Sequence, residues 1–221
     1  MAGIILNKTI SDGLVFYLDA ANPKSYVSGS TTWYDISRGG VNSTLVNDPT
    51  FSSTNGGGIV FDGIDDYIST TQRFTNQSFT YEVVLKPTNV SKDQMYIGNE
   101  LLTALYTRIN NSRAFVSIRT NVAQRSLTHP QLLLNNNIYH IVSIYNGVQL
   151  KIYVNNVLSV GSEINETLLT PWGTSSIGRW INTDTRNFVG NIYTVRLYNR
   201  ELSSQEVLQN YNATKSRFGL I

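Results

Sequence analysis

The sequence predicts an all-β fold in which two antiparallel sheets pack as a sandwich, with one short helix near the C-terminus. About a dozen short apolar segments are separated by turn residues at spacings of about 8–12 residues, which is typical of β-sandwiches. Residues 79–86 alternate between two kinds of side chain, as expected of a half-buried strand. Only residues 203–213 carry clear helix signals. We expect residues 13–221 to form a single domain after a lead-in of residues 1–12.

Composition narrows the class of protein. Hydrophobic residues make up 41% of the 221 residues and charged residues only 14%, as in a folded, aromatic-rich β protein. The absence of cysteine excludes thiolate metal sites, thiol nucleophiles and disulfides. The first residues lack a signal-peptide pattern, and no apolar run approaches the length of about 18 residues that a membrane span needs. We therefore expect a soluble protein that has no membrane partner and is not exported by the general route.

The charge is small overall but uneven along the chain. A net charge of +2 argues against nucleic acid as a partner. No acidic residue lies between Glu100 and Glu163, and this span holds five of the basic residues, Arg108, Arg113, Arg119, Arg125 and Lys151. If folding brings them together they form a basic patch for an anionic glycan, a nucleic acid or an acidic protein. The alternative is that they are scattered over strand faces.

The apolar segments are assigned to strands in order. In the first half these are residues 13–19, 43–46, 58–61, 67–69 and 79–86, and in the second half 95–97, 102–106, 114–119, 138–145, 148–154, 157–160, 176–180 and 189–197. Asn146-Gly147 predicts a hairpin with a type I′ turn, and Asn155-Asn156 predicts a second turn. Residues 120–137, which include His129, are expected to be a loop.

One helix is predicted from the residues at its N-terminal end. Ser203 can cap it, Glu206 three residues later completes a capping box, and Leu202 can pack on Val207 as a hydrophobic staple. Val207, Leu208 and Tyr211 form an apolar stripe. The sequence therefore predicts a helix over 203–213 that docks on the sandwich.

The segment 61–68 places three carboxylates, Asp62, Asp65 and Asp66, between two short apolar runs. It reads as strand, tight turn, strand, with Gly63 at a positive-φ position and Asp side chains bonded to the turn's own amides. The same carboxylates can hold a hard cation such as Ca²⁺, although the loop is shorter than the self-sufficient Ca²⁺ loop of about twelve residues. Both interpretations stay open, with the structural turn favoured.

Catalytic groups are sparse. A retaining glycosidase needs two carboxylates about 5 Å apart, and Glu82 is alone on its strand. His140 lies inside a strand, so we interpret it as a packed or hydrogen-bonded histidine rather than a base. For binding, aromatic and amide side chains can stack on sugars and read hydroxyls. Trp172, Arg179 and Trp180 lie in or beside predicted loops and are the candidate ligand-binding residues, whereas Trp33 is expected to pack inside.

Six segments in order resemble the laminin-G-like, or concanavalin A-like, jelly-roll superfamily. They are GLVFYLD at 13–19, WYDIS at 33–37, FDGIDDYI at 61–68, FTYEVVLKP at 79–87, YHIVSIYNG at 139–147 and GNIYTVRLYN at 190–199. DAANP at 19–23 and QNYNA at 209–213 are similar to versions found in bacteriophage structural proteins. The chain departs from the family pattern at Asn156, where Gly is usual, and at Arg38-Gly39-Gly40, where Ser-Gly-Asn-Gly is common.

The resemblance implies a jelly-roll sandwich and a calcium site at the acidic pair Asp65-Asp66. It implies a non-enzymatic binding or structural module, and we expect a virion surface protein, either a capsid decoration or a fibre- or tail-associated protein. Its expected location is the virion, and its expected partners are other virion proteins, cell-surface glycans or both. The alternatives are a free calcium-dependent lectin and, less favoured, a glycoside hydrolase.

Overall fold

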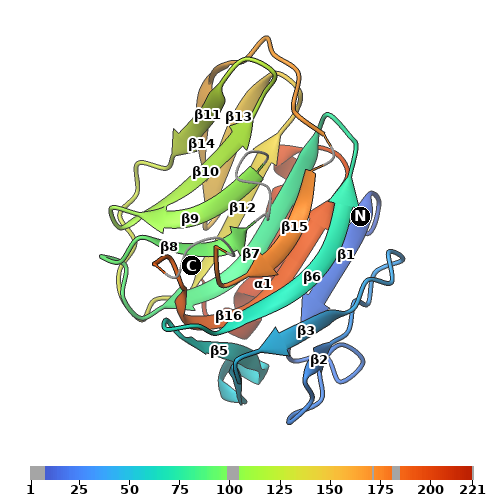
Figure 1. Ribbon diagram of the computed structural model, residues 1–221, viewed down its shortest axis with the longest axis vertical. Helices are drawn as coiled ribbons and strands as arrows, with labels where there is room; N and C mark the ends of the chain where they lie inside the picture. Colours follow the sequence, from blue (N-terminus) through green and yellow to red (C-terminus); the bar gives the residue numbers. More distant parts are fainter. Residues whose placement is uncertain (1–7, 99–104, 171, 181–184, 221) are drawn as a thin grey trace, which may run out of the picture.

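The computed structural model describes residues 8–98, 105–170, 172–180 and 185–220. Their strands form two antiparallel sheets that face each other across a common core, with one α-helix packed on the outside (Figure 1). The predicted fold class, an all-β jelly-roll sandwich with one C-terminal helix, is confirmed.

Sheet A has the strand order β14-β13-β12-β7-β16-β5-β4, and β1 also pairs with β16. Its strands are β1 (Leu14–Asp19), β4 (Thr50–Ser52), β5 (Gly58–Asp62), β7 (Phe79–Pro87), β12 (Tyr139–Tyr145), β13 (Gln149–Val154), β14 (Val157–Glu163) and β16 (Val189–Tyr198). A short 3₁₀ helix, η1 (Thr54–Gly56), lies between β4 and β5.

Sheet B has the order β11-β10-β9-β8-β15-β6-β3-β2. Its strands are β2 (Thr32–Trp33), β3 (Ser43–Val46), β6 (Tyr67–Phe74), β8 (Gln94–Gly98), β9 (Leu105–Asn110), β10 (Arg113–Arg119), β11 (Gln124–Thr128) and β15 (Trp172–Ile177). The main core cluster takes apolar side chains from both sheets, and Trp33 is fully buried in it, as expected.

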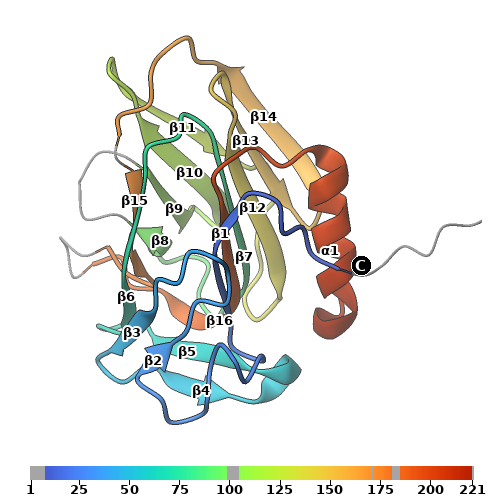
Figure 2. The same cartoon turned by 90° about the vertical axis from the view of Figure 1, so that its right-hand side faces the viewer.

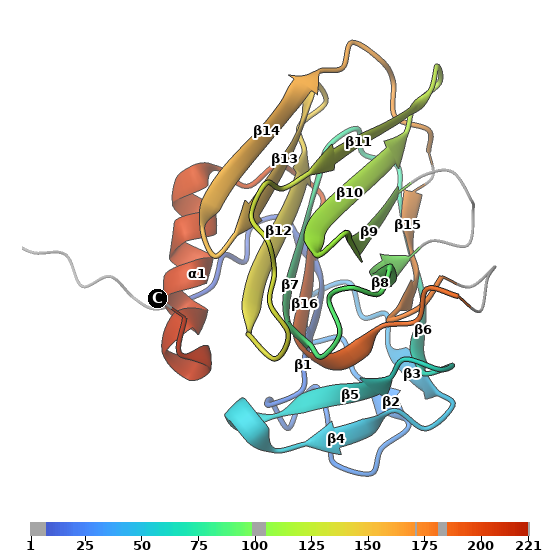
Figure 3. The same cartoon turned by 90° about the vertical axis from the view of Figure 1, so that its left-hand side faces the viewer.

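Helix α1 (Ser204–Phe218) lies on the face of sheet A that points away from sheet B (Figure 2). Ser203 and Glu206 form the predicted capping box, and Gly219 ends the helix in the left-handed conformation. The helix extends five residues beyond the predicted end at 213, because Thr214 and Phe218 continue its buried stripe. Figure 3 shows the same layers from the opposite side, with α1 against β12, β13 and β14.

Burial on β7 departs from the predicted half-buried pattern. Every residue of the strand except Lys86 is buried, including Thr80, Glu82 and Val84 on the face expected to be solvated. The reason is that β7 lies in the middle of sheet A, with the core on one side and α1 on the other.

The hairpins form where the sequence predicts them, but the first turn is of another type. The strands β12 and β13 pair through Asn146-Gly147, and only Gly147 has a positive φ, of 93°. A type I′ turn needs positive φ at both central residues, so the predicted turn type is wrong. Asn155 and Asn156 take φ values of 48° and 65°, so asparagine supplies the left-handed conformations for which the family pattern uses Gly. The segment predicted as loop over 120–137 contains β11, a polar strand at the edge of sheet B.

Both ends of the described chain lie on the helix side of the sandwich. Gln209 of α1 donates to the carbonyl of Lys8 at 2.7 Å, and Asn210 accepts from the amide of Ile10 at 2.8 Å. The chain finishes just beyond α1 itself. None of the helices in the described residues has the length and apolar character that crossing a membrane requires.

Candidate functional site

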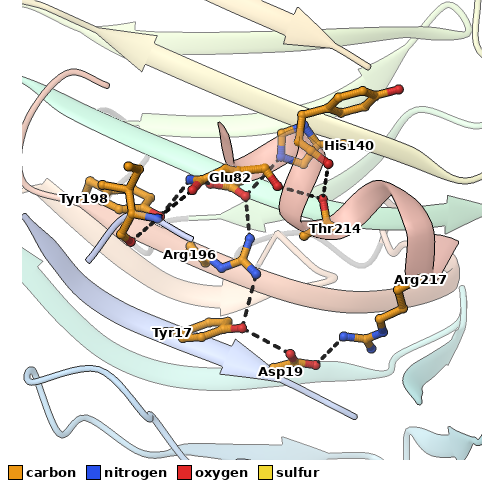
Figure 4. A network of polar contacts seen from close by, with 11 residues as sticks. Tyr17, Asp19, Glu82, His140, Arg196, Tyr198, Thr214 and Arg217 are labelled. Carbon is orange, nitrogen blue, oxygen red and sulfur yellow. Dashed lines mark hydrogen bonds and ion pairs between the residues drawn. The ribbon is translucent and has the colours of Figure 1, made fainter. Parts of the chain in front are cut away.

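A buried polar network lies between sheet A and α1 (Figure 4). At its centre is Glu82 of β7, whose side chain is completely buried. Arg196 of β16 donates to Oε1 of Glu82, the Nε2 of His140 on β12 lies 3.0 Å from the same oxygen, and Asn210 donates to Oε2 at 2.6 Å. Each of the three partners comes from a different element, so the carboxylate ties two strands and the helix to β7.

The network continues to the surface through Tyr17. Arg196 donates to the hydroxyl of Tyr17 at 3.2 Å, and that hydroxyl donates to Asp19 at 3.1 Å. Arg217, near the end of α1, pairs with Asp19 at 2.8 Å. The middle of α1, through Asn210, and its C-terminal end, through Arg217, are thereby joined to strands by polar and charged groups as well as by apolar contacts.

The surroundings of Glu82 favour its ionised form. Burial favours its neutral form, but the charge of Arg196 and the hydrogen bonds from His140 and Asn210 outweigh burial and lower the pKa of Glu82 to about 2. A catalytic acid at neutral pH needs the opposite shift, together with access to substrate. The geometry gives Glu82 a structural role, and His140, fully buried beside it, is a packed histidine as interpreted from the sequence.

The three aspartates of the β5–β6 turn do come together. Asp62, Asp65 and Asp66 each offer a carboxylate oxygen, and these oxygens lie within 4.8 Å of one another. Gly63 has a φ of 78°, and a Cβ there would lie 2.7 Å from the Cβ of Val189, so the turn requires glycine. Asp62 accepts from the amide of Ile64 at 2.7 Å, as an Asx turn does.

Asp66 differs from its two exposed neighbours because it is buried. Its Oδ2 accepts from the amide of Asp62 at 2.9 Å. Burial, together with the charges of Asp62, Asp65 and Asp48, raises the pKa of Asp66 to about 6. A divalent cation would relieve this repulsion, so the donor set fits Ca²⁺, with all three carboxylates as ligands. The structural turn and the metal site are therefore compatible.

A second cluster lies on the outer face of sheet B, the face that points away from sheet A. The rings of Tyr106 and Phe115 stack at 6.0 Å, and Trp180 packs on Tyr106 at 5.0 Å. Arg108 lies over the Phe115 ring at 4.6 Å, and Arg186 lies over the Trp180 ring at 4.8 Å. The cluster alternates aromatic and guanidinium groups across β9, β10 and the segment after β15.

Asp93 holds the two arginines of this cluster. Its Oδ2 accepts from Arg108 at 2.6 Å and from Arg186 at 2.9 Å. The residues next to Asp93 and Arg186 in sequence hydrogen-bond to the acidic turn, because Lys92 donates to the carbonyl of Gly63 and Asn187 donates to that of Ile64. Adjacent residues thus serve both clusters, and the acidic turn borders the outer face of sheet B.

The predicted ligand-binding residues fall in different settings. Trp180 is only 9% exposed, so its ring is mostly covered by Tyr106 and Arg186. Arg179 is partly exposed and lies over the ring of Tyr67 at 5.3 Å. Trp172 begins β15, but its side chain lies outside the described part of the structure. Ligand binding by these three residues stays a prediction.

The sequence interpretation missed Tyr106 and Arg186, which pack on Trp180, and Asp93, which pairs with Arg186. A signal was present for one of them, since Tyr106 falls in a segment assigned to a strand. Asp93 and Arg186 lie 93 positions apart and meet only through the pairing of β8 with β15. No pattern within a short stretch of sequence predicts such a contact.

The basic run between Glu100 and Glu163 is divided by the fold. Arg125 pairs with Glu166, and Lys151 pairs with Glu201 at 2.6 Å. Arg108, Arg113 and Arg119 share the outer face of sheet B, because Ala114, Val116 and Ile118 between them fill the core. Three arginines of the run therefore share one face, with Arg113 and Arg119 at the two ends of β10, and the other two basic residues are paired elsewhere.

Several solved structures share this fold. The receptor-binding domain of botulinum neurotoxin C/D mosaic serotype aligns with a TM-score of 0.71 at 15% identity, over 91% of this chain and 51% of that one. The serotype D binding domain gives 0.72 at 14%, over 91% and 52%. The binding domain of Paraclostridial Mosquitocidal Protein 1 gives 0.68 at 13%, over 91% and 52%. The chain spans about half the length of these structures.

Comparison of sequences gives a direct assignment. No curated protein sequence matches the chain. Residues 62–208, which run from the acidic turn to the first turns of α1, match a laminin G model described as the concanavalin A-like lectin/glucanases superfamily. Because this match covers more than half of the sequence and the sandwich agrees with it, the chain belongs to the concanavalin A-like lectin/glucanase superfamily.

Proposed function

We propose that this chain is a non-enzymatic binding module that holds a glycan on the outer face of sheet B. One observation carries the proposal. Helix α1 and both ends of the described chain lie on sheet A, whereas no described helix covers the outer face of sheet B (Figure 2). A module attached to a larger assembly through either end would present that face outward.

The side chains of this face suit a glycan. Gln124, Ser126 and Thr128 of β11 are exposed and lie opposite Arg119, Ser117 and Phe115 of β10. Amide, hydroxyl and guanidinium groups are the side chains that hydrogen-bond sugar hydroxyls and acidic substituents. Glu82, the lone strand carboxylate considered for hydrolysis, is buried on the opposite side of sheet A, which supports binding without cleavage.

A steric block tests the binding face. Ser126→Trp places a large ring on an exposed position of this face, and Gln205→Trp does the same on exposed helix α1. On a glycan array, we expect Ser126→Trp to lose at least about tenfold in affinity for any glycan the wild type binds, and Gln205→Trp to bind normally. Equal binding by both variants would place the site elsewhere.

We propose the surface of a virion as the setting, with other virion proteins as partners, either as a capsid decoration or in a fibre or tail. The support is the likeness of residues 19–23 and 209–213 to phage structural proteins. The test is whether the protein sediments with purified virus particles in a density gradient. Recovery only in the soluble fraction would leave the free lectin as the better description.

Calcium at Asp62, Asp65 and Asp66 is part of the proposal. Calorimetry with CaCl₂ should give a binding isotherm for the wild type and none for Asp65→Asn. Asp65 suits this test because its carboxylate is exposed and no described backbone amide depends on it. If the wild type gave no heat with CaCl₂, the proposed calcium site would be wrong. Glycan binding that EDTA abolishes would favour the alternative of a calcium-dependent lectin.

A further inference from the structure

The outer face of sheet B carries an excess of positive charge. Arg108, Arg113, Arg119 and Arg186 gather there, and Asp93 is the one described carboxylate that pairs with any of them. Four positive charges against one negative leave this group at +3, although the acidic turn with Asp62, Asp65 and Asp66 borders the same face. The charges that remain without a carboxylate partner among the described residues are those of Arg113 and Arg119.

Two of the arginines have no acidic partner in the described residues. Arg113 donates only to backbone carbonyls, those of Pro130 at 3.2 Å and Asn111 at 3.3 Å. Arg119 makes no ion pair in the described part of the chain and is partly exposed. Because Phe115 and Ser117 separate them on the same face of β10, the two guanidinium groups stand in line along the strand.

We propose that this face selects anionic polysaccharides, binding carboxylate or sulfate groups through Arg113 and Arg119. Arginine suits such groups because its planar fork forms paired hydrogen bonds with an oxyanion. The hydroxyls of Ser126 and Thr128 lie directly alongside and supply partners for the sugar ring. The amide nitrogen of Gln124 already donates to Tyr106 and Ser117, so its amide oxygen is the group offered to a ligand. The inference rests on the proposed glycan-binding function and adds the chemical class of the ligand.

The same face argues against a nucleic acid as the anion. Single-stranded nucleic acids are held by stacking bases on accessible aromatic rings. Phe115 and Trp180 are each only 9% exposed, and their rings are occupied by Arg108, Tyr106 and Arg186. In the described part of this cluster, each ring packs against another ring or a guanidinium group, and the contacts left for a ligand are charges and hydroxyls.

Dextran sulfate and uncharged dextran of the same chain length test the charge requirement. We expect the intact protein to bind dextran sulfate and polygalacturonate but not dextran, measured by interferometry with the polysaccharide immobilised. Raising the salt from 50 to 300 mM should weaken binding several-fold, since screening acts on exposed charges. Preferential binding to an oligothymidylate of equal charge would overturn the inference in favour of a nucleic acid.

Variants that remove charge distinguish binding at this face from attraction to the net charge of the protein. Arg113→Gln/Arg119→Gln should weaken dextran sulfate binding by at least about tenfold. Lys8→Gln/Lys215→Gln removes the same charge from exposed positions beside α1 and should change affinity less than about twofold. Equal losses in both variants would mean attraction to net charge alone and would overturn the inference. Thermal melts should match, because none of the four side chains has an acidic partner among the described residues.

The inference and the proposed function fail in different ways. If a neutral glycan binds and Ser126→Trp blocks it while the arginine variants bind normally, the face is a glycan site but the anionic selection is wrong. If Ser126→Trp leaves all glycan binding unchanged, the proposed function itself is wrong at this face.

Discussion

Glu82 is the residue on which sheet A and helix α1 depend together. Its carboxylate is the only counter-charge in contact with Arg196 among the described residues, and both side chains are buried. Glu82→Gln keeps the shape but leaves a buried guanidinium without an anion. We expect the free energy of unfolding to fall by about 3–5 kcal/mol, measured by urea denaturation.

The matched control for this change is Glu163→Gln on β14, where the carboxylate is exposed. That substitution should alter the free energy of unfolding by less than about 0.5 kcal/mol. If Glu82→Gln proved as mild as the control, the network of Figure 4 would not hold the helix in place.

Asp66 gives the metal-free protein an unusual pH response. Because its pKa is raised to about 6, its contribution to stability is fully present below the unfolded value near 3.8 and is lost as pH rises through 6. Lowering the pH from 7.5 to 5 in EDTA should therefore stabilise the wild type relative to Asp66→Asn by about 1–2 kcal/mol. Thermal melts of both proteins at each pH measure this difference.

The comparison with Asp66→Asn is needed because His129 acts in the opposite sense. Its Nε2 donates to the carbonyl of Val157 at 3.0 Å and its Nδ1 accepts from the amide of Gln131 at 3.2 Å, an arrangement that suits the neutral ring. Burial lowers the pKa of His129, so its contribution is lost as pH falls below about 6.5. A pH response identical in wild type and Asp66→Asn would assign the whole effect to groups other than Asp66.

At the scale of elements, the start of α1 is set by its capping box. Ser203 accepts from the amide of Glu206, and Glu206 accepts from the amide of Ser203 at 2.8 Å. Ser203→Ala should lower the free energy of unfolding by about 1 kcal/mol, whereas Ser204→Ala, one residue inside the helix, should be neutral or slightly stabilising. Chemical denaturation of the pair checks this, and equal effects would contradict the cap.

Helix and strand positions were predictable where residues close in sequence determine them. Asn146-Gly147 predicts a turn and Ser203 predicts a helix start from local backbone chemistry. The place of the hairpin and the start of the helix are confirmed, whereas the type I′ turn is not, because only Gly147 has a positive φ. Strand β11 was missed because its residues QRSLT are polar, and only pairing with β10 makes them a strand. The alternation on β7 predicted one solvated face, but α1 arrives from more than a hundred residues away to cover it.

The two candidate sites also differ in how far the sequence predicts them. The aspartates of the acidic turn are close in sequence, so their convergence was visible before the structure. The outer face of sheet B was not, because Arg108 and Arg113 are joined by strand pairing and Asp93 and Arg186 by distant segments. Long-range geometry of this kind depends on sheet order, which a single sequence does not specify.

For the whole molecule, the shared core predicts cooperative unfolding. The main cluster includes Trp33 of sheet B together with Phe16 and Leu18 of sheet A, so neither sheet can lose its packing alone. Tryptophan fluorescence and far-ultraviolet circular dichroism should follow one coincident transition in urea. Two separated transitions would show that part of the sandwich unfolds independently.

The placement of both chain ends beside α1 has a consequence for affinity when many copies act together. Copies anchored by residues near Lys8 or Leu220 to one surface would all direct sheet B away from it. A long polymer could then contact several copies at once, and the second contact would be intramolecular, with an effective concentration in the millimolar range for short tethers. A weak individual site is sufficient for tight, reversible attachment under that geometry.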